Sequence, residues 1–309
     1  MSKQSAPDPA RAGLTFGLLA YGLWGVLPIY FKQLGAVSPV DIVAHRVVWS
    51  LLFLALLLAV TRGWSQVRAG LEDRRTLVLL LTTSVLIAVN WLLYVYAVNS
   101  GHILAGSLGY YLSPLMNIVL GRFILRERLT GLQWAAVAIA AAGVSVLAAG
   151  AGTTLWISLT LCVSFATYGL LRKIVAVDAL AGLSIETAIL LPIAVAWLAL
   201  GFGTGRPVLG STSEEMWLLV LAGVVSTTPL LLFTAAARRL RYSTLGMLQF
   251  VAPTLQFVLA VALYDEEFSR AHAIAFGAIW TALVLYTTSL VRDLRAQRRA
   301  ADSPELCEP

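Results

Sequence analysis

Three ionisable side chains fall inside long apolar runs of the sequence: His45, Arg46 and Glu186. A charged group at membrane depth costs about 2.5–3.5 kcal/mol on insertion scales, so such groups face protein or a water-filled path. We expect gating or proton coupling, with His45 and Arg46 at the outer end of a pathway and Glu186 at its inner end. The alternative is that they extend toward water and anchor helix ends at the interface. Because their depths differ, we expect no direct ion pair between the two ends.

Uncharged polar and aromatic side chains form a second set, and these suit the binding of a small organic solute. Asn90 and Tyr94 are one helical turn apart, and Tyr110 and Asn117 lie on one face of another run. Trp24 also lies near the middle of an apolar run, where the preference of aromatic residues for membrane interfaces does not explain it. Packing in the core is the alternative for some of these rings. Together they predict a cavity for a partly aromatic or amphipathic molecule.

An offset of 139 residues brings the two halves of the chain into register and doubles this polar face. The offset places Tyr110 on Gln249, Asn117 on Gln256, and Pro114 on Pro253. A proline inside a helix removes one backbone donor and frees a carbonyl, which at membrane depth needs a partner. We therefore expect helix kinks at Pro114 and Pro253 beside a hydrated cavity that Gln249 and Gln256 also line. The alternative is two packing kinks that neighbouring helices satisfy.

The surrounding composition is that of a membrane protein. Of the 309 residues, 59% are hydrophobic and 12% are charged, against about 25% charged residues in soluble domains. Runs of about 17–25 apolar residues can span a bilayer as helices. We count ten: 14–31, 40–61, 77–98, 104–124, 131–149, 154–173, 182–201, 216–236, 243–263 and 272–291. The fold class expected is an all-α integral membrane protein.

Basic residues predict the orientation of these spans, because cytoplasmic loops retain Lys and Arg. Most of the 22 basic residues, Arg172 among them, fall in alternate connecting segments if both termini are cytoplasmic. Five spans per half is an odd number, so the halves must cross the membrane in opposite senses. We therefore expect a cytoplasmic tail 1–13, a first repeat 14–149, an inverted second repeat 150–291 and a cytoplasmic tail 292–309. Inverted repeats place the substrate site at midplane between the halves.

Motifs for other chemistry are not found in the sequence. There is no phosphate-binding G-x-x-x-x-G-K-[ST] loop, no G-x-S-x-G and no H-E-x-x-H. The three histidines and two cysteines do not cluster as metal ligands. We therefore expect neither an enzyme nor a protein with a metal or another cofactor. Topology explains the basic loops, so no nucleic-acid partner is expected. Stripes of small residues at 135–143 and 273–282 predict close helix contact or a homodimer.

Four runs of the sequence resemble the EamA permeases of the drug/metabolite transporter superfamily: His45 to Ser50, Asn90 to Asn99, Ser107 to Gly121, and Phe233 to Arg241. The resemblance covers about residues 11 to 290. It implies ten helices in two inverted five-helix EamA-type repeats, residence in the bacterial inner membrane, and a link to chloramphenicol sensitivity or resistance. One departure is that Arg126-Glu127 stands where the family often has Gly-Glu. We expect that change to affect loop geometry more than transport.

These observations predict a secondary transporter that moves a small organic solute, with the lipid bilayer as its environment. Export of chloramphenicol-like drugs by alternating access is the first interpretation, and an exporter or uptake carrier for amino acids or other metabolites is the second. A non-transporting membrane scaffold or sensor is an alternative of another class. A scaffold has no need of matched amides at midplane, which favours transport.

Overall fold

The computed structural model describes residues 9–35, 37–100, 102–149, 152–206, 208–264 and 270–302. Within those ranges the chain is helical, and no β-strand is present. The elements are α1 (Pro9–Gln33), α2 (Pro39–Thr61), α3 (Trp64–Glu72), α4 (Arg74–Asn99), α5 (Ile103–Phe123), α6 (Gly131–Ala148), the 3-10 turn η1 (Gly152–Thr154), α7 (Leu155–Ile174), α8 (Ala179–Gly203), α9 (Ser213–Arg239), α10 (Tyr242–Gln249), α11 (Val251–Tyr264) and α12 (Arg270–Asp302).

Eight of these helices are long and apolar enough to cross a membrane: α1, α2, α4, α6, α7, α8, α9 and α12. The expected run 104–124 is helix α5, and the run 243–263 is divided between α10 and α11. The prediction of an all-α, multi-pass membrane protein is therefore confirmed. Helix α3 lies where we expected a loop, and an exposed pair one turn apart, Arg68 and Glu72 at 2.7 Å, stabilises it.

Polar side chains fix the beginnings of several helices. Thr130 and Gln133 form a reciprocal capping box at the start of α6, and Thr212 and Glu215 form another at the start of α9. The Asp178 carboxylate accepts a hydrogen bond of 2.7 Å from the backbone N–H of Ala181 and caps α8. Each cap satisfies backbone donors that have no partner inside the helix. These helix boundaries are thus specified by local sequence.

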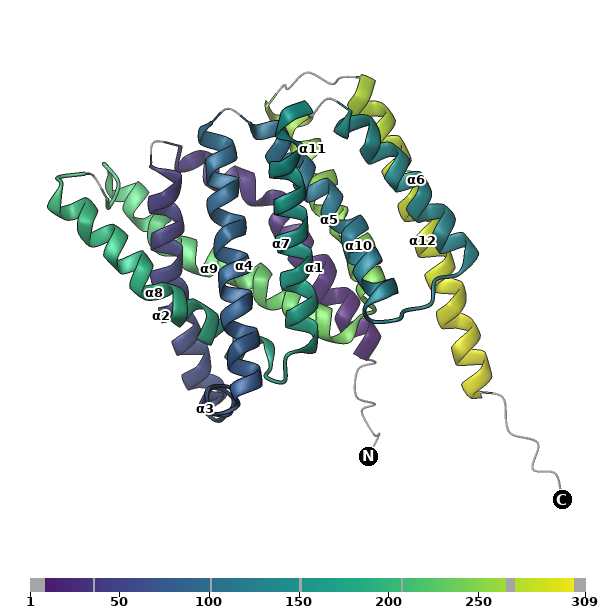
Figure 1. Ribbon diagram of the computed structural model, residues 1–309, viewed down its shortest axis with the longest axis horizontal. Helices are drawn as coiled ribbons and strands as arrows, with labels where there is room; N and C mark the ends of the chain where they lie inside the picture. Colours follow the sequence, from purple (N-terminus) through teal and green to yellow (C-terminus); the bar gives the residue numbers. More distant parts are fainter. Residues whose placement is uncertain are drawn as a thin grey trace.

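The helices are arranged so that segments from both halves of the chain meet at the centre. α6 and α12 pair along one edge of the molecule, and α8 lies at the opposite edge (Figure 1). Between these edges, α1 packs against α9 and α11, whereas α4 and α5 pack against α7. α2 packs against both α8 and α9. The start of α1 and the end of α12 lie on the same side of the helical body.

The stripes of small residues bring α6 and α12 into close contact within the chain. A Cβ atom placed on Gly143 would lie 2.7 Å from the Cβ of Ala278 and 3.0 Å from the carbonyl oxygen of Ala275. Ala136 and Ala140 are fully buried in the same apolar cluster as Ile279 and Ala282. The stripe on one helix therefore packs against the stripe on the other.

The two prolines of the expected repeat differ in their surroundings. The helical path is interrupted at Phe250, three residues before Pro253, where α10 ends and α11 begins. There the N–H of Phe250 donates to Met247, 3.3 Å away, in the tighter three-residue pattern. By contrast, α5 continues through Pro114. The Pro114 carbonyl instead faces Gly246, whose Cβ would lie 2.7 Å from it. α5 and α10 thus come together closely at this point.

Gly223 allows the backbones of α2 and α9 to touch, and this contact predicts a large effect of a small substitution. A Cβ atom at Gly223 would lie 2.6 Å from the backbone nitrogen of Ser50. We expect Gly223→Ala to lower the free energy of unfolding by about 1–3 kcal/mol, because the added methyl group forces the helices apart. Thermal unfolding in detergent measures this change.

Gly22→Ala is the matched control for that experiment. Gly22 also lies inside a long helix, but a Cβ there would meet no atom within 4 Å. Alanine is the better helix former by roughly 0.5–1 kcal/mol, so this variant should be as stable as the wild type or more stable. Equal stability of the two variants would contradict the close contact of α2 and α9.

Candidate functional site

An aromatic cluster occupies the centre of the helical body. The ring of Trp24 on α1 lies 6.0 Å from that of Phe165 on α7 and 5.6 Å from that of Phe233 on α9. Phe165 in turn contacts Tyr110 on α5, with ring centroids 6.4 Å apart. Tyr110 meets Tyr94 of α4 at 5.5 Å. Residues from five helices thus form a continuous aromatic surface, which includes three residues of the predicted cavity.

Asn90 is held beside this cluster by partners on two helices. Its side chain is 1% exposed. The Asn90 amide donates hydrogen bonds of 2.9 Å to the carbonyl of Leu161 and to the hydroxyl of Ser164, both on α7. Its carbonyl oxygen accepts a longer bond of 3.5 Å from the Tyr110 hydroxyl. Asn90 and Tyr110 therefore lie in one polar network, whereas Tyr94 is 40% exposed.

The predicted amide residues divide into one buried pair and one separate contact. The Asn117 amide on α5 donates a 2.8 Å hydrogen bond to the Gln249 side chain on α10, and both residues are buried. Gln256 lies elsewhere, exposed on α11, and donates a 3.0 Å bond to the backbone carbonyl of Trp24. Asn117 and Gln249 thus join α5 to α10, and Gln256 joins α11 to α1.

His45 and Arg46 are adjacent in sequence but point to different places. The His45 imidazole is hydrogen-bonded over 2.8 Å to the carbonyl of Val208, in the segment between α8 and α9. The Arg46 guanidinium instead lies over the ring of Trp91 on α4, 3.7 Å from its centroid. Successive helix residues project about 100° apart, which explains the separation. His45 therefore contributes to one end of the molecule and Arg46 to its interior.

Arg46 lines a small, partly open cavity between α2, α4, α8 and α9. Its volume is about 20 Å³, and Ser50, Thr187, Ser226 and Thr227 contribute to its wall. Such a volume holds roughly one water molecule. The Thr227 hydroxyl donates to Ser50 over 2.6 Å, and Ser50 donates to the carbonyl of Gly223 over 3.2 Å. The cavity is polar on the face toward α9, and it is too small for an organic solute in this conformation.

Glu186 takes part in a second buried polar cluster near the beginning of α8. Its carboxylate lies 3.5 Å from the guanidinium of Arg172, and both side chains are almost fully buried. Thr83 on α4 donates a hydrogen bond of 2.5 Å to one carboxylate oxygen, and the Tyr168 hydroxyl donates one of 3.3 Å to the other. Arg172 also donates to the carbonyl of Ala179 over 3.1 Å. Helices α4, α7 and α8 thus share one buried ion pair.

The buried position of Arg172 corrects one expectation from the sequence. The charge pattern of the sequence places Arg172 in a cytoplasmic connecting segment, whereas it lies in the last turn of α7 and is 0% exposed. Gly182 makes room for it, because any Cβ at that position would collide with the guanidinium. A glycine one helical turn before an intramembrane acidic residue is the signal in the sequence that could have indicated this arrangement.

A contact between the start of α2 and the end of α8, which we name the Asp41 contact, was also not expected from the sequence. The Asp41 carboxylate is 2% exposed and lies 3.3 Å from the guanidinium of Arg206. It also accepts a 2.8 Å hydrogen bond from the Trp197 indole. Together with the His45 bond to Val208, the contact holds the segment after α8 against the start of α2. In the sequence, the sign of this contact is the acidic residue itself, one helical turn before His45.

A second contact, which we name the Glu127 contact, lies on the opposite side of the body. The Glu127 carboxylate accepts hydrogen bonds from the backbone N–H and the hydroxyl of Ser243, at 2.9 and 2.6 Å, and from the N–H of Tyr242. The first N–H groups of a helix have no partner inside it, and the helix dipole favours a negative charge there. Glu127 therefore fastens the segment after α5 to the start of α10.

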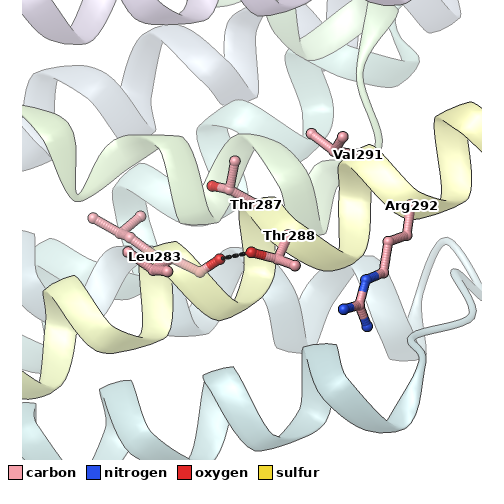
Figure 2. Close-up of a pocket in the computed structure, with 6 residues that line it drawn as sticks. Leu283, Thr287, Thr288, Val291 and Arg292 are labelled. Carbon is pink, nitrogen blue, oxygen red and sulfur yellow. Dashed lines mark hydrogen bonds between the residues drawn. The ribbon is translucent and has the colours of Figure 1, made fainter.

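A surface hollow runs along the exterior of α12. It has a volume of about 470 Å³ and is lined by Leu283, Val284, Thr287, Thr288, Val291 and Arg292. Figure 2 shows these side chains on one helix, with the Thr288 hydroxyl bonded to the carbonyl one turn earlier, at 2.8 Å. The lining residues all come from α12, so this hollow joins no residues from different parts of the chain.

The geometry thus brings Arg46, Asn90, Tyr110 and Trp24 to the interior and places contacts at both ends. Residues 11–149 match the model of the EamA-like transporter family. An uncharacterized transporter of Vibrio cholerae is 44% identical over 94% of this chain and 97% of that protein. The chain belongs to the EamA-like transporter family. It is therefore a membrane transporter and not an enzyme.

Relatives named RarD occur among the similar proteins. Protein RarD of Escherichia coli K12 is 42% identical over 91% of this chain and 95% of its own. A chloramphenicol-sensitive protein RarD of Pseudomonas aeruginosa is 33% identical over 93% and 97%. A crystal structure with 21% sequence identity superposes with a TM-score of 0.71, covering 90% of this chain and 98% of that one. That likeness shows that the helical fold is shared.

The buried ion pair predicts a strong dependence of stability on both partners. We expect Arg172→Met to lower the free energy of unfolding by about 3–5 kcal/mol, because it leaves the Glu186 carboxylate buried without its counter-charge. The double variant Arg172→Met with Glu186→Gln should recover most of that loss. Chemical unfolding in detergent measures the double variant and the two single variants, Arg172→Met and Glu186→Gln. The exposed pair Arg68 and Glu72 serves as the control, because its removal should change stability little. A double variant that loses the sum of the two single losses would contradict the pairing.

Proposed function

We propose that this protein is a secondary-active transporter that exports a small organic solute across the bacterial inner membrane by alternating access. The observation that carries the proposal is the cavity beside Arg46, which helices from both halves of the chain enclose. The Asp41 contact lies where α2 begins and the Glu127 contact where α10 begins, at opposite ends of the helical body (Figure 1). Such an arrangement suits a path that opens to one side at a time.

The packing of the helices supports ten spans in two inverted repeats, if α10 and α11 count as one broken span. In the proposed repeats α1 corresponds to α7, and α4 corresponds to α9. The contact of α1 with α9 is therefore equivalent to that of α7 with α4, and both contacts are present. Likewise α5 corresponds to α11, so the contact of α1 with α11 is equivalent to that of α7 with α5, and both are present. On this basis we propose repeats at residues 14–149 and 150–291, with tails at 1–13 and 292–309.

The distribution of charge and the two ends of the helical body support an orientation with both termini in the cytoplasm. The start of α1 and the end of α12 lie on one side, which suits two cytoplasmic termini. Arg126, Arg128, Arg238, Arg239 and Arg241 lie near the Glu127 contact, as expected for cytoplasmic segments. We therefore propose that the Glu127 contact closes the cytoplasmic side and the Asp41 contact the outer side. A homodimer would need a surface other than the stripes of α6 and α12, since these pack together within the chain.

The lining residues bear on the class of solute. Trp24, Tyr94 and Tyr110 provide aromatic surface and Asn90 provides hydrogen bonds, which suits a partly aromatic molecule. Chloramphenicol-like drugs are the first class, supported by the name of the Pseudomonas aeruginosa relative. Amino acids or related metabolites, carried outward or inward, are the alternative class. A non-transporting scaffold or sensor remains the contrasting hypothesis for the experiment.

Counterflow with purified protein in liposomes tests transport directly. Liposomes are loaded with unlabelled chloramphenicol or L-phenylalanine and then diluted into the matching radiolabelled compound, with and without a pH gradient. We expect transient accumulation of at least one tracer, because exchange through a single site concentrates label at the expense of the internal pool. Absence of counterflow for both tracers and for a wider metabolite panel would support the scaffold hypothesis and contradict this proposal.

Glu186 is the residue through which we propose that protons couple to transport. It is the intramembrane carboxylate of the cluster with Arg172, Thr83 and Tyr168. We expect Glu186→Gln to remove the response of exchange to a pH gradient, because a glutamine cannot release a proton. Glu72→Gln, on the exposed helix α3, is the matched control and should retain the response. An unchanged rate and pH dependence in Glu186→Gln would exclude Glu186 from coupling.

A further inference from the structure

Arg46 lacks a counter-charge among the described residues. None of the ion pairs within those ranges includes its guanidinium. The two acidic side chains buried in the helical body have other partners: Glu186 lies against Arg172, and Asp41 lies against Arg206. A cation inside a membrane protein is costly unless a negative or polar group faces it. A partner that is not part of the described chain would remove that cost.

The ring of Trp91 satisfies only one face of the Arg46 guanidinium. It lies 3.7 Å away and provides a cation–π contact. The five N–H donors of a guanidinium project in its plane and match the two oxygens of a carboxylate. Across the described ranges, the Arg46 guanidinium donates no hydrogen bond to the protein, whereas Arg172, Arg238, Arg239 and Arg241 each donate to carbonyl groups. The donors of Arg46 are therefore available for a ligand.

A buried hydroxyl group in the same cavity also lacks a partner. Ser226 is 4% exposed and lines the cavity together with Arg46. Its hydroxyl has no hydrogen-bond partner in the described chain. Its neighbours differ, since Thr227 and Ser50 are bonded to each other and Thr187 donates to the carbonyl of Leu183. An unsatisfied buried hydroxyl group is unfavourable, and a ligand that accepts its hydrogen bond would remove that cost.

We propose that Arg46 and Ser226 bind the carboxylate of the transported solute, so that the solutes are organic acids or amino acids. This inference rests on the proposed transport function and names its substrate class. The guanidinium forms the charged hydrogen bonds, the Ser226 hydroxyl donates one more, and the Trp91 ring supports Arg46 from the opposite face. Chloramphenicol carries no carboxylate, so the inference favours the metabolite alternative over the drug. The cavity of about 20 Å³ must widen before a carboxylate enters.

Matched pairs of probes test the site without any mutation. The purified full-length chain is heated in detergent with increasing phenylacetate or phenylacetamide, indole-3-acetate or indole-3-acetamide, and L-phenylalanine or its amide. We expect half-maximal stabilisation by at least one carboxylate at a concentration at least tenfold below that of its amide. Equal stabilisation by acid and amide in every pair, or stabilisation by none of the carboxylates, would overturn the inference.

Variants then assign the preference to the two residues. Arg46→Gln should abolish the difference between acid and amide, Arg46→Lys should retain part of it, and Ser226→Ala should weaken binding of the acid severalfold. Arg68→Gln removes one positive charge from exposed helix α3 and is the control that should leave the preference intact. An Arg46→Gln variant that still prefers the acid would overturn the inference. If that variant does not fold, Arg46→Lys and the wild-type comparison still decide the question.

Counterflow with the same probes separates the two proposals. Carboxylates that bind in the acid-selective manner but never exchange across the membrane would contradict transport and leave the anion site standing. Exchange restricted to the amides would leave transport standing and overturn the anion site. Exchange of acids that depends on Arg46 would support both.

Discussion

A polar group inside the hydrocarbon core of a membrane has no water to bind, so it must find its partner within the protein. This constraint accounts for the central contacts of the molecule. Asn90 reaches across to α7, Asn117 pairs with Gln249 on α10, and Glu186 collects Thr83, Tyr168 and Arg172. The bonds from Asn90, Asn117 and Thr83 join helices that are distant in sequence, and those of Tyr168 and Arg172 join the consecutive helices α7 and α8. The buried polar groups therefore specify which helices meet, while the apolar residues around them supply the packing.

The same constraint applies to the acidic groups at the two ends of the helical body. Asp41 is satisfied by Arg206 and Trp197 at one side, and Glu127 by the start of α10 at the other. These contacts consist of a few hydrogen bonds and ion pairs between segments that are distant in the sequence, so either set can be exchanged for contacts with water when that side opens. Arg46 and Ser226 share one cavity, and the described chain supplies no counter-charge to Arg46 and no hydrogen-bond partner to the Ser226 hydroxyl. A solute that bonds to both groups would stabilise the conformation in which they face each other, so that binding and conformation are coupled.

Much of this arrangement could be predicted from the sequence, because the cost of intramembrane polar groups is a property of residue type and depth. That reasoning selected Asn90, Arg46 and Glu186 and predicted the helical class. It could not show which partners His45 and Arg46 meet, since these depend on how α2 is rotated against its neighbours. It assigned Arg172 to a connecting segment, because the sequence does not distinguish a basic residue at a helix end that faces water from one that packs against Gly182. The partners of Asp41 and Glu127 come from distant segments, and only the packed structure brings them together.

Bridging the two contacts tests the central claim that both ends of one path must open in turn. In a chain with Cys162→Ala and Cys307→Ser, one variant carries Asp41→Cys with Arg206→Cys and another carries Glu127→Cys with Ser243→Cys. A short bifunctional thiol reagent, cleavable by reductant, joins each pair in liposomes, and exchange of a tracer carried by the wild type is measured against the unbridged variant. The account predicts that either bridge stops exchange and that reduction restores it. Exchange at an unchanged rate with either end bridged would contradict it.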